Sequence, residues 1–70
     1  MLPPQCRWIH DASGKSYLHY HYRCVAIVYP DGRCWLQAWR QEGYHPGKSK
    51  ALTMRMVERW VAARRGWPGS

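Results

Sequence analysis

Aromatic residues are as numerous in this chain as aliphatic ones, and this balance limits what the chain can fold into. The sequence contains five Trp and five Tyr but no Phe, against ten Leu, Ile and Val in 70 residues. So few aliphatic residues, combined with a net charge of +7, would ordinarily indicate disorder. Each buried aromatic side chain covers about 150–250 Å², so ten of them can replace the missing aliphatic core. We therefore expect a small, aromatic-rich folded domain.

The length of the chain predicts a single domain over residues 1–70. No apolar run approaches the roughly 18 residues that a membrane-spanning helix needs, and the first residues lack the features of a secretory signal. We therefore expect a cytoplasmic protein with no membrane partner. In that compartment Cys6, Cys24 and Cys34, which form no closely spaced pair, are expected to be free thiols.

The first part of the chain, 5–41, has the composition of an antiparallel sheet. Residues 22–29 and 33–40 are rich in β-branched and aromatic residues. Between them, Pro30-Asp31-Gly32 is typical of a hairpin turn, because proline fixes φ and Asp-Gly tolerates positive φ. These two segments predict a β-hairpin.

An earlier strand over 5–10 completes the predicted sheet. The turn-forming cluster 11–15 joins it to a long strand that starts near Ser16. The sheet is followed by a predicted loop over 42–48, which contains two glycines and a proline. We therefore expect three antiparallel strands.

The faces of this sheet depend on the register of the hairpin. If Asp31-Gly32 is a two-residue turn, Tyr29 faces Cys34. One face then carries Val25, Ile27, Tyr29, Cys34, Leu36 and Ala38, and the other carries Tyr22, Cys24, Ala26, Val28, Trp35, Gln37 and Trp39. A shift of one residue exchanges the set of one strand between the faces.

Residues 49–65 predict an amphipathic helix. Ser49 is a natural N-cap, and Gly66 and Pro68 end the helix before a tail over 66–70. At 100° per residue, an apolar stripe flanked by Val57 is formed by Leu52, Met56, Trp60, Ala63 and Trp67. The opposite side carries Arg55, Glu58, Ala62 and Arg65. The predicted fold class is α+β, with a three-stranded antiparallel sheet and one C-terminal helix packed on one face (β-β-β-α).

Positive charge is concentrated in the second half of the chain. Residues 1–39 carry a net charge of +2 and residues 40–70 a net charge of +5, which creates a field that attracts polyanions. Lys48 and Lys50 flank the start of the helix, where free amide groups and the helix dipole favour phosphate. Together with Arg55 and Arg59, they are the candidate phosphate contacts.

The sheet provides a second set of candidate contacts. If the helix covers the face of Ile27 and Leu36, then Trp35 and Trp39 lie on the other side. They are near Arg23, Arg33 and Arg40 on the same strands. Exposed aromatic rings beside arginines can stack on bases or ribose, and they can equally anchor a protein interface. In the alternative interpretation, both tryptophans pack in the core with Trp60.

The histidines and cysteines give little indication of a metal site. His19 and His21 fall on one side of a strand, a pattern that can hold a divalent metal in single-strand nickases. Cys6 and His10 form one loose ligand pair, but the second pair of a structural zinc site is absent. The four acidic residues show no catalytic spacing. We therefore expect no metal, no cofactor and no catalysis. A metal-dependent nuclease is kept only as the third and least favoured function.

Two segments resemble known nucleic-acid-binding families. Residues 22–33, followed by a strand and a helix, resemble the three-stranded-sheet DNA-binding domains of phage-type tyrosine integrases and plant Apetala-type transcription factors. That resemblance implies a sheet that enters the major groove, with contacts from Arg23, Arg33, Trp35, Gln37, Trp39 and Arg40. Gly47-Lys48-Ser49-Lys50 is similar to the start of the last helix in double-stranded-RNA-binding domains, where it contacts phosphates. The first helix of that family is missing here.

These observations favour a small, non-enzymatic nucleic-acid-binding module, for DNA rather than RNA. In size and in its Trp and Arg content, the chain resembles the accessory proteins of phages and mobile elements. The alternative function is a small inhibitor of the host-takeover or anti-CRISPR kind, which would bind an acidic protein surface through the same Trp, Tyr and Arg side chains.

Overall fold

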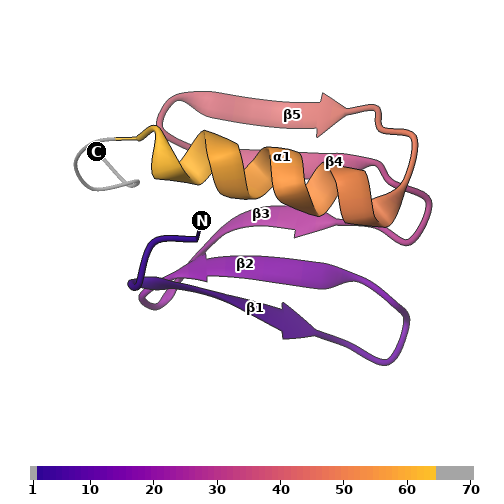
Figure 1. The fold of residues 1–70 in the computed structure, drawn as a ribbon, viewed down its shortest axis with the longest axis horizontal. Helices are drawn as coiled ribbons and strands as arrows, with labels where there is room; N and C mark the ends of the chain where they lie inside the picture. Colours follow the sequence, from indigo (N-terminus) through magenta and orange to yellow (C-terminus); the bar gives the residue numbers. More distant parts are fainter. Residues whose placement is uncertain (1, 65–70) are drawn as a thin grey trace.

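The computed structural model describes residues 2–64, which form a five-stranded antiparallel sheet and one helix (Figure 1). The elements are β1 (Cys6–His10), β2 (Ser16–Tyr20), β3 (Arg23–Val28), β4 (Cys34–Ala38), β5 (Gln41–His45) and α1 (Lys50–Ala62). The strands lie in the order β1-β2-β3-β4-β5, so each strand pairs with the next along the chain. The predicted α+β class, with an antiparallel sheet followed by a helix, is confirmed. The prediction of three strands is wrong, because there are five.

One additional strand arises because the predicted long strand after Ser16 is broken. His21 and Tyr22 form a turn, and β2 and β3 fold back on each other so that Tyr20 lies opposite Arg23. His21 adopts a φ of 56°, a left-handed conformation that a continuous strand does not contain. The aromatic and β-branched composition of this stretch suits a strand on either side of the turn, and so conceals it.

The other additional strand is β5, which occupies part of the predicted loop over 42–48. It is reached through a two-residue turn, Trp39-Arg40, with φ values of 51° and 67°. Two positive φ angles are the signature of a type I′ hairpin turn, and they bring Gln41 opposite Ala38. The glycine that suggested a loop, Gly43, lies within the strand opposite Leu36.

The β3–β4 hairpin differs by one residue from the predicted register. The Tyr29 amide donates to the Arg33 carbonyl at 2.8 Å, and the Gly32 amide donates to the Tyr29 carbonyl at 3.0 Å. The loop therefore contains three residues and ends on Gly32 at a φ of 99°, the left-handed position of a three-residue hairpin loop. Val28, rather than Tyr29, lies opposite Cys34. As a result, Ala26, Ile27 and Val28 exchange faces relative to the prediction.

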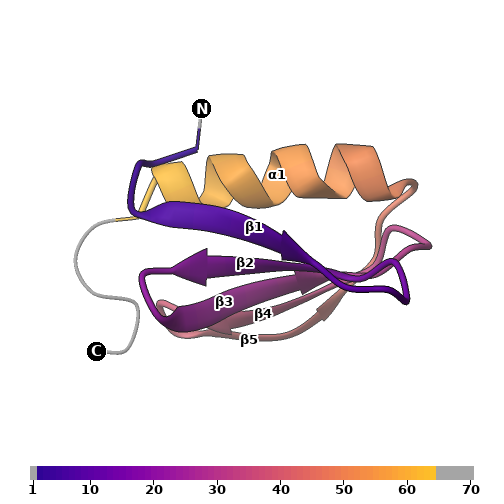
Figure 2. The ribbon, with the colours of Figure 1, turned by 90° about the horizontal axis from the view of Figure 1, so that it is seen from below.

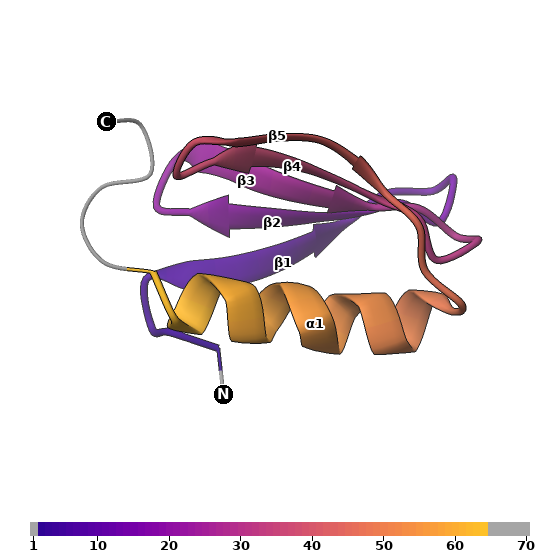
Figure 3. The same ribbon diagram turned by 90° about the horizontal axis from the view of Figure 1, so that it is seen from above.

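The core lies between α1 and one face of the sheet (Figures 2 and 3). Its buried apolar residues are Cys6, Leu18, Val25, Ala26, Val28, Cys34, Leu36, Ala38, Val57 and Val61. Two consecutive residues of β3, Val25 and Ala26, are both fully buried. The pairing with β2 shifts between Leu18 and His19, so Val25 is the additional residue of a β-bulge.

The helix begins as predicted but presents a different face to the sheet. The Ser49 hydroxyl accepts a hydrogen bond from the Leu52 amide at 3.2 Å, which is an N-cap. The buried helical residues are Thr53, Val57 and Val61. Leu52 is 54% exposed and Met56 is 48% exposed, so the prediction that they lead the buried stripe is wrong. The stripe's last residue, Trp67, and Arg65 at the predicted helix end lie outside the described residues.

Polar contacts fix this rotation of the helix. The Thr53 hydroxyl donates to the Gly32 carbonyl. The Lys50 ammonium donates to the Gly14 carbonyl at 2.6 Å, and the Trp8 indole donates to the Glu58 carboxylate at 2.7 Å. The first bond ties α1 to the β3–β4 loop, and the other two draw one side of it towards β1 and the β1–β2 turn, so the side with Leu52 and Met56 is outermost. The helix described here is neither long nor apolar enough to cross a membrane.

Candidate nucleic-acid interface

The sheet face opposite α1 carries a row of large apolar side chains, one from each strand. Cross-strand pairing places them side by side in the order Ile9, Tyr17, Ile27, Trp35 and Tyr44. Four inter-strand spacings of about 4.8 Å make the row about 19 Å long. No element of residues 2–64 packs on this face, since α1 lies on the other one (Figure 2). We call this surface the open face.

Three aromatic rings form a cluster at the β5 end of the row. The rings of Trp35 and Tyr44 are 4.8 Å apart between centroids, and those of Tyr29 and Tyr44 are 5.9 Å apart. The hydroxyls of Tyr29 and Tyr44 are hydrogen-bonded at 3.3 Å, and this bond raises the pKa of Tyr29. Tyr44 is 61% exposed. The cluster therefore offers neutral, pre-positioned ring surface to solvent.

Hydrogen bonds also fix the polar groups beside the cluster. The Trp35 indole donates to the Gln37 side-chain carbonyl at 2.8 Å, and the Gln37 amide nitrogen donates to the Cys24 main-chain carbonyl at 2.8 Å. The Arg23 guanidinium reaches the Gln37 main-chain carbonyl at 3.4 Å. Trp35 is thus held in one orientation by its bond to Gln37.

Cationic side chains border the aromatic cluster near the β3–β4 loop. The Lys15 ammonium lies 5.5 Å and the Arg33 guanidinium 5.3 Å from the centre of the Tyr29 ring. Arg33 also forms an exposed salt bridge with Asp31 at 2.8 Å. The pKa of Asp31 is lowered, first by the hydrogen bond from the Arg33 amide and then by the charge of Arg33. Aromatic rings and positive charge therefore meet on one surface, as stacking sites for unpaired bases require.

Among the residues predicted to contact nucleic acid, Arg23 pairs with Tyr20, which packs against the core, and so lies on the helix side of the sheet. Arg33 and Trp35 belong to the open face. Trp39 does not, and its predicted place beside Trp35 is wrong. The positive φ of Trp39 turns its ring to the helix side, where it packs edge-to-face on Trp60 at 5.3 Å. The core interpretation therefore holds for Trp39 but not for Trp35. Arg40 is exposed in the same turn, beyond the end of β4.

The helical group of predicted contacts is divided between the helix and the segment before it. Lys48, Arg55 and Arg59 are exposed, the first before the helix and the others on it. Lys50 is half-buried and bonded to the Gly14 carbonyl, so it is part of the packing between α1 and the β1–β2 turn. Arg55 and Arg59 thus lie on the side of the molecule away from the open face, whereas Lys48 belongs to the segment that packs against Gly32, next to Arg33.

The histidines and cysteines are not gathered into a metal site. His19 lies in β2 and His21 in the following turn, and residues 2–64 contain no group of three or more potential metal-binding side chains. The three cysteines are free thiols. Burial raises the pKa of each of these thiols, so they are not activated nucleophiles.

The sequence reasoning missed most of the aromatic row. Ile9, Tyr17 and Ile27 join it through the register, and Tyr44 joins it through a strand that was predicted as a loop. No residue of β5 is fully buried, and residues 41–45 show no apolar–polar alternation in the sequence, so no clear signal could have identified this strand.

Comparisons of this chain with protein-family models, curated proteins and solved structures gave no match. Function must therefore be inferred from the surfaces themselves.

Proposed function

We propose that this protein binds single-stranded nucleic acid on the open face of its sheet. The observation that carries this proposal is the uncovered cross-strand row with its cluster of Tyr29, Trp35 and Tyr44, bordered by cationic side chains. Ring faces can stack on any unpaired base, whereas bases inside a duplex stack on each other. The row therefore suits a single strand better than a duplex groove.

The charge distribution supports the same ligand. The chain carries a net charge of +7. Two of its four carboxylates are engaged close to the open face, since Asp11 caps a turn and Asp31 pairs with Arg33. Lys15 and Arg33 lie beside the Tyr29 ring, so phosphates could be contacted while the bases stack. DNA is the first ligand to test, with RNA of the same length as the comparison.

Fluorescence anisotropy with a labelled oligonucleotide of about 12 nucleotides tests the proposal. We expect the order of affinity to be single strand above duplex, and the logarithm of the affinity to fall linearly with the logarithm of salt concentration. Tyr44→Ala should weaken binding by about fivefold or more, because a base–aromatic stack contributes about 1–3 kcal/mol. The matched control is Met56→Ala, which truncates a similarly exposed side chain on the helix.

A second pair of variants separates this site from general attraction by charge. Lys15→Gln and Arg59→Gln each remove one positive charge, the first from beside the Tyr29 ring of the open face and the second from the helix. We expect only Lys15→Gln to reduce the salt slope, by about 0.7 for one phosphate contact on a single strand. No binding at low salt, or equal effects of the sheet and helix variants, would overturn the proposal.

A further inference from the structure

A groove of about 220 Å³ lies on the helix side of the sheet, between α1 and the edge strand β5. Its apolar wall is formed by Leu36, Met56, Val57 and Trp60. Its polar rim is formed by Gln41, His45 and Arg64. A protein cavity of about 150 Å³ can hold a benzene molecule, so this groove has room for one large apolar side chain.

Gly43 keeps the middle of the groove open. It lies opposite Leu36, and Gln41 and His45, two residues to either side of it, face the same way. No atom lies within 4 Å of the position that a Cβ of residue 43 would occupy, so the missing side chain leaves open space beside Leu36. Gly43 also has a φ of 143°, which other residues rarely adopt. The opening is therefore built into the backbone of β5.

The outer edge of β5 offers main-chain hydrogen-bonding groups. In the described part of the chain, β5 pairs with β4 alone. The two-residue turn before β5 makes Ala38 and Gln41 a hydrogen-bonded pair, and such pairs alternate with non-bonded ones along an antiparallel ladder. The amide and carbonyl groups of Glu42 and Tyr44 therefore point away from β4. They are placed to bond to a strand added at this edge.

The groove and the edge can act on the same added strand. Such a strand lies about 4.8 Å beyond β5 and directs every second side chain to the helix side. Its residue opposite Gly43 therefore lies next to the groove. Figure 1 shows α1 running opposite to β5, which puts Arg64, just after the helix, near Gln41 at the start of the strand.

Arg64 supplies a positive charge at this end of the groove. Its Nε donates to the Trp60 carbonyl at 3.0 Å, and its guanidinium lies 5.6 Å from the centre of the Trp60 ring. Among residues 2–64, no carboxylate lines the groove, and the chain carries a net charge of +7. The other guanidinium N–H groups of Arg64 are therefore available to an acidic side chain.

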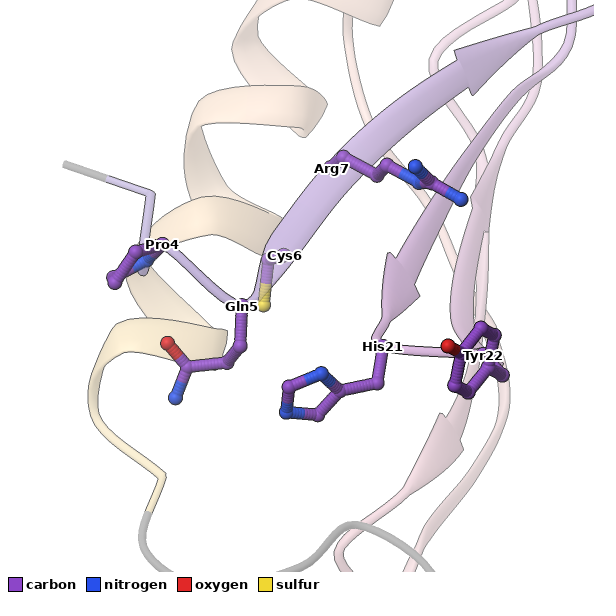
Figure 4. A pocket seen from close by; sticks show the side chains of 6 residues that line it. All are labelled: Pro4, Gln5, Cys6, Arg7, His21 and Tyr22. Carbon is purple, nitrogen blue, oxygen red and sulfur yellow. The ribbon is translucent and has the colours of Figure 1, made fainter.

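The hollow at the opposite edge of the sheet is less suited to an added strand. It has a volume of about 290 Å³ and lies at the start of β1. Its Arg7 and His21 side chains point apart (Figure 4), so they cannot hold one ligand group between them. At the β5 edge, by contrast, the groove and the charge of Arg64 lie on one side of the sheet.

We propose that the β5 edge binds an extended peptide that carries an apolar residue and, two positions away, an acidic residue. The peptide adds a sixth strand antiparallel to β5, with its main chain bonded to Glu42 and Tyr44. The apolar side chain enters the groove beside Gly43, and the acidic side chain on the same face reaches Arg64. The open face lies on the other side of the sheet, so this binding goes beyond the proposed function and does not depend on it.

Amide hydrogen exchange of the full-length protein, followed by NMR, tests the added strand. The probe is a capped synthetic peptide, Thr-Asp-Thr-Leu-Thr-Asp-Thr, whose Leu and two Asp share one face when it is extended. We expect the amides of Glu42 and Tyr44 to exchange about tenfold or more slowly at saturating peptide, because they become hydrogen-bonded. Peptides with Lys in place of Asp, or Ala in place of Leu, should bind more weakly by about fivefold or more.

N-methylation of the peptide separates strand addition from contact through side chains alone. In the added strand, the two Thr next to Leu direct their N–H groups to β5, and the Leu N–H points away from it. N-methylation of these two Thr should abolish binding, whereas N-methylation of Leu should leave it unchanged. Equal loss of affinity from both modifications would overturn strand addition.

Two pairs of variants test the groove and its charge. Met56→Ala removes part of the groove wall, and Leu52→Ala truncates a similarly exposed side chain outside it. Arg64→Gln removes the charge at the groove, and Arg59→Gln removes one from elsewhere on the helix. We expect the first variant of each pair to weaken peptide binding by about threefold or more, and the second to leave it unchanged.

The oligonucleotide assay keeps the two proposals apart. Met56→Ala should weaken the peptide and not the single strand, so failure of one ligand to bind leaves the proposal for the other standing. No slowing of the Glu42 and Tyr44 amides at about 1 mM peptide would overturn the peptide site. Two other occupants would also overturn it: a second copy, if the free protein is a dimer with these amides already protected, or residues 65–70, if the peptide binds only after their deletion.

Discussion

At the scale of single residues, Asp11 shows how one side chain shapes both a turn and the open face. One of its carboxylate oxygens accepts from the Ser13 amide at 3.0 Å, the Ser13 hydroxyl at 2.7 Å and the Lys15 amide at 3.0 Å. The other accepts from the Tyr17 hydroxyl at 2.9 Å. These donors, the Ser13 hydroxyl first, lower the pKa of Asp11 to about 2. Asp11 therefore closes the β1–β2 turn and orients one ring of the aromatic row.

This pKa predicts a pH dependence of stability. The pKa of Asp11 in the folded state is about 2, below the value of about 3.9 in an unfolded chain. Its contribution to the free energy of unfolding is therefore complete above about pH 4 and is lost as the pH falls through about 2. Asp11→Ala should be less stable than the unmodified protein at pH 7 and pH 5, and the difference should shrink between pH 4 and pH 2.

Urea denaturation followed by tryptophan fluorescence at several pH values measures this difference. Ser13→Ala serves as the control, because it removes one donor and leaves the carboxylate to titrate. A gap between Asp11→Ala and the unmodified protein that stays constant down to pH 2 would contradict the assigned role.

Trp35 and Trp39 show what sequence reasoning can and cannot predict about single residues. Both fall on one face of the predicted strand because they are separated by an even number of positions, and Trp35 does lie on the face away from the helix. Trp39 follows the last residue of β4, and its φ of 51° ends the alternation there. Alternation predicts the face of a side chain only within a strand. Neither tryptophan is a turn-forming residue, so the sequence does not show that β4 ends before Trp39.

At the scale of elements, the turns decide how much of the sheet could be predicted. Pro30-Asp31-Gly32 carries strong turn residues, and a hairpin forms there, although its loop is one residue longer than predicted. The turns at His21-Tyr22 and Trp39-Arg40 contain no Gly, Pro, Asn or Asp, so nothing in their composition marks them. The two additional strands follow from these two unmarked turns.

The Trp39-Arg40 turn predicts a stabilising substitution. Arg40 has a φ of 67°, a conformation that costs an L-residue about 1–2 kcal/mol and glycine very little. Glycine is also the preferred second residue of a type I′ turn. We therefore expect Arg40→Gly to raise the free energy of unfolding by about 0.5–1 kcal/mol, after allowance for the greater freedom of glycine in the unfolded chain.

Thermal and urea unfolding of Arg40→Gly and Arg40→Ala test this expectation. The alanine variant removes the same charge and side chain but keeps the unfavourable φ, so it should show no gain. If both variants are stabilised equally, the effect comes from the lost charge and not from relief of the backbone. Neither substitution alters the open face, so the affinity for a single strand should stay the same.

At the scale of the whole molecule, the unusual aromatic content serves both sides of one sheet. Trp8, Tyr20, Trp39 and Trp60 pack around the core under α1. Tyr17, Tyr29, Trp35 and Tyr44 lie with the open face. The sequence predicted that some aromatic residues would be surplus to the core. It could not assign them individually, because the assignment depends on the register, on two unmarked turns and on the rotation of the helix.

The net charge of +7 predicts opposite salt effects on the free and the bound protein. In the free protein, salt screens repulsion among like charges and should raise the unfolding temperature between about 0.02 and 0.15 M NaCl. A bound single strand raises that temperature by an increment set by its affinity. Because salt weakens phosphate contacts, this increment should fall over the same range.

A helix variant separates the two effects in one melting experiment. The double variant of Arg55→Gln and Arg59→Gln lowers the net charge by two on the side away from the open face. The unfolding temperature of the free variant should therefore depend less on salt than that of the unmodified protein. The increment in unfolding temperature caused by the bound strand should keep its salt dependence. If the increment instead loses its salt dependence in this variant, the strand contacts the helix, and the ligand must be reassigned from the open face to the basic surface of α1.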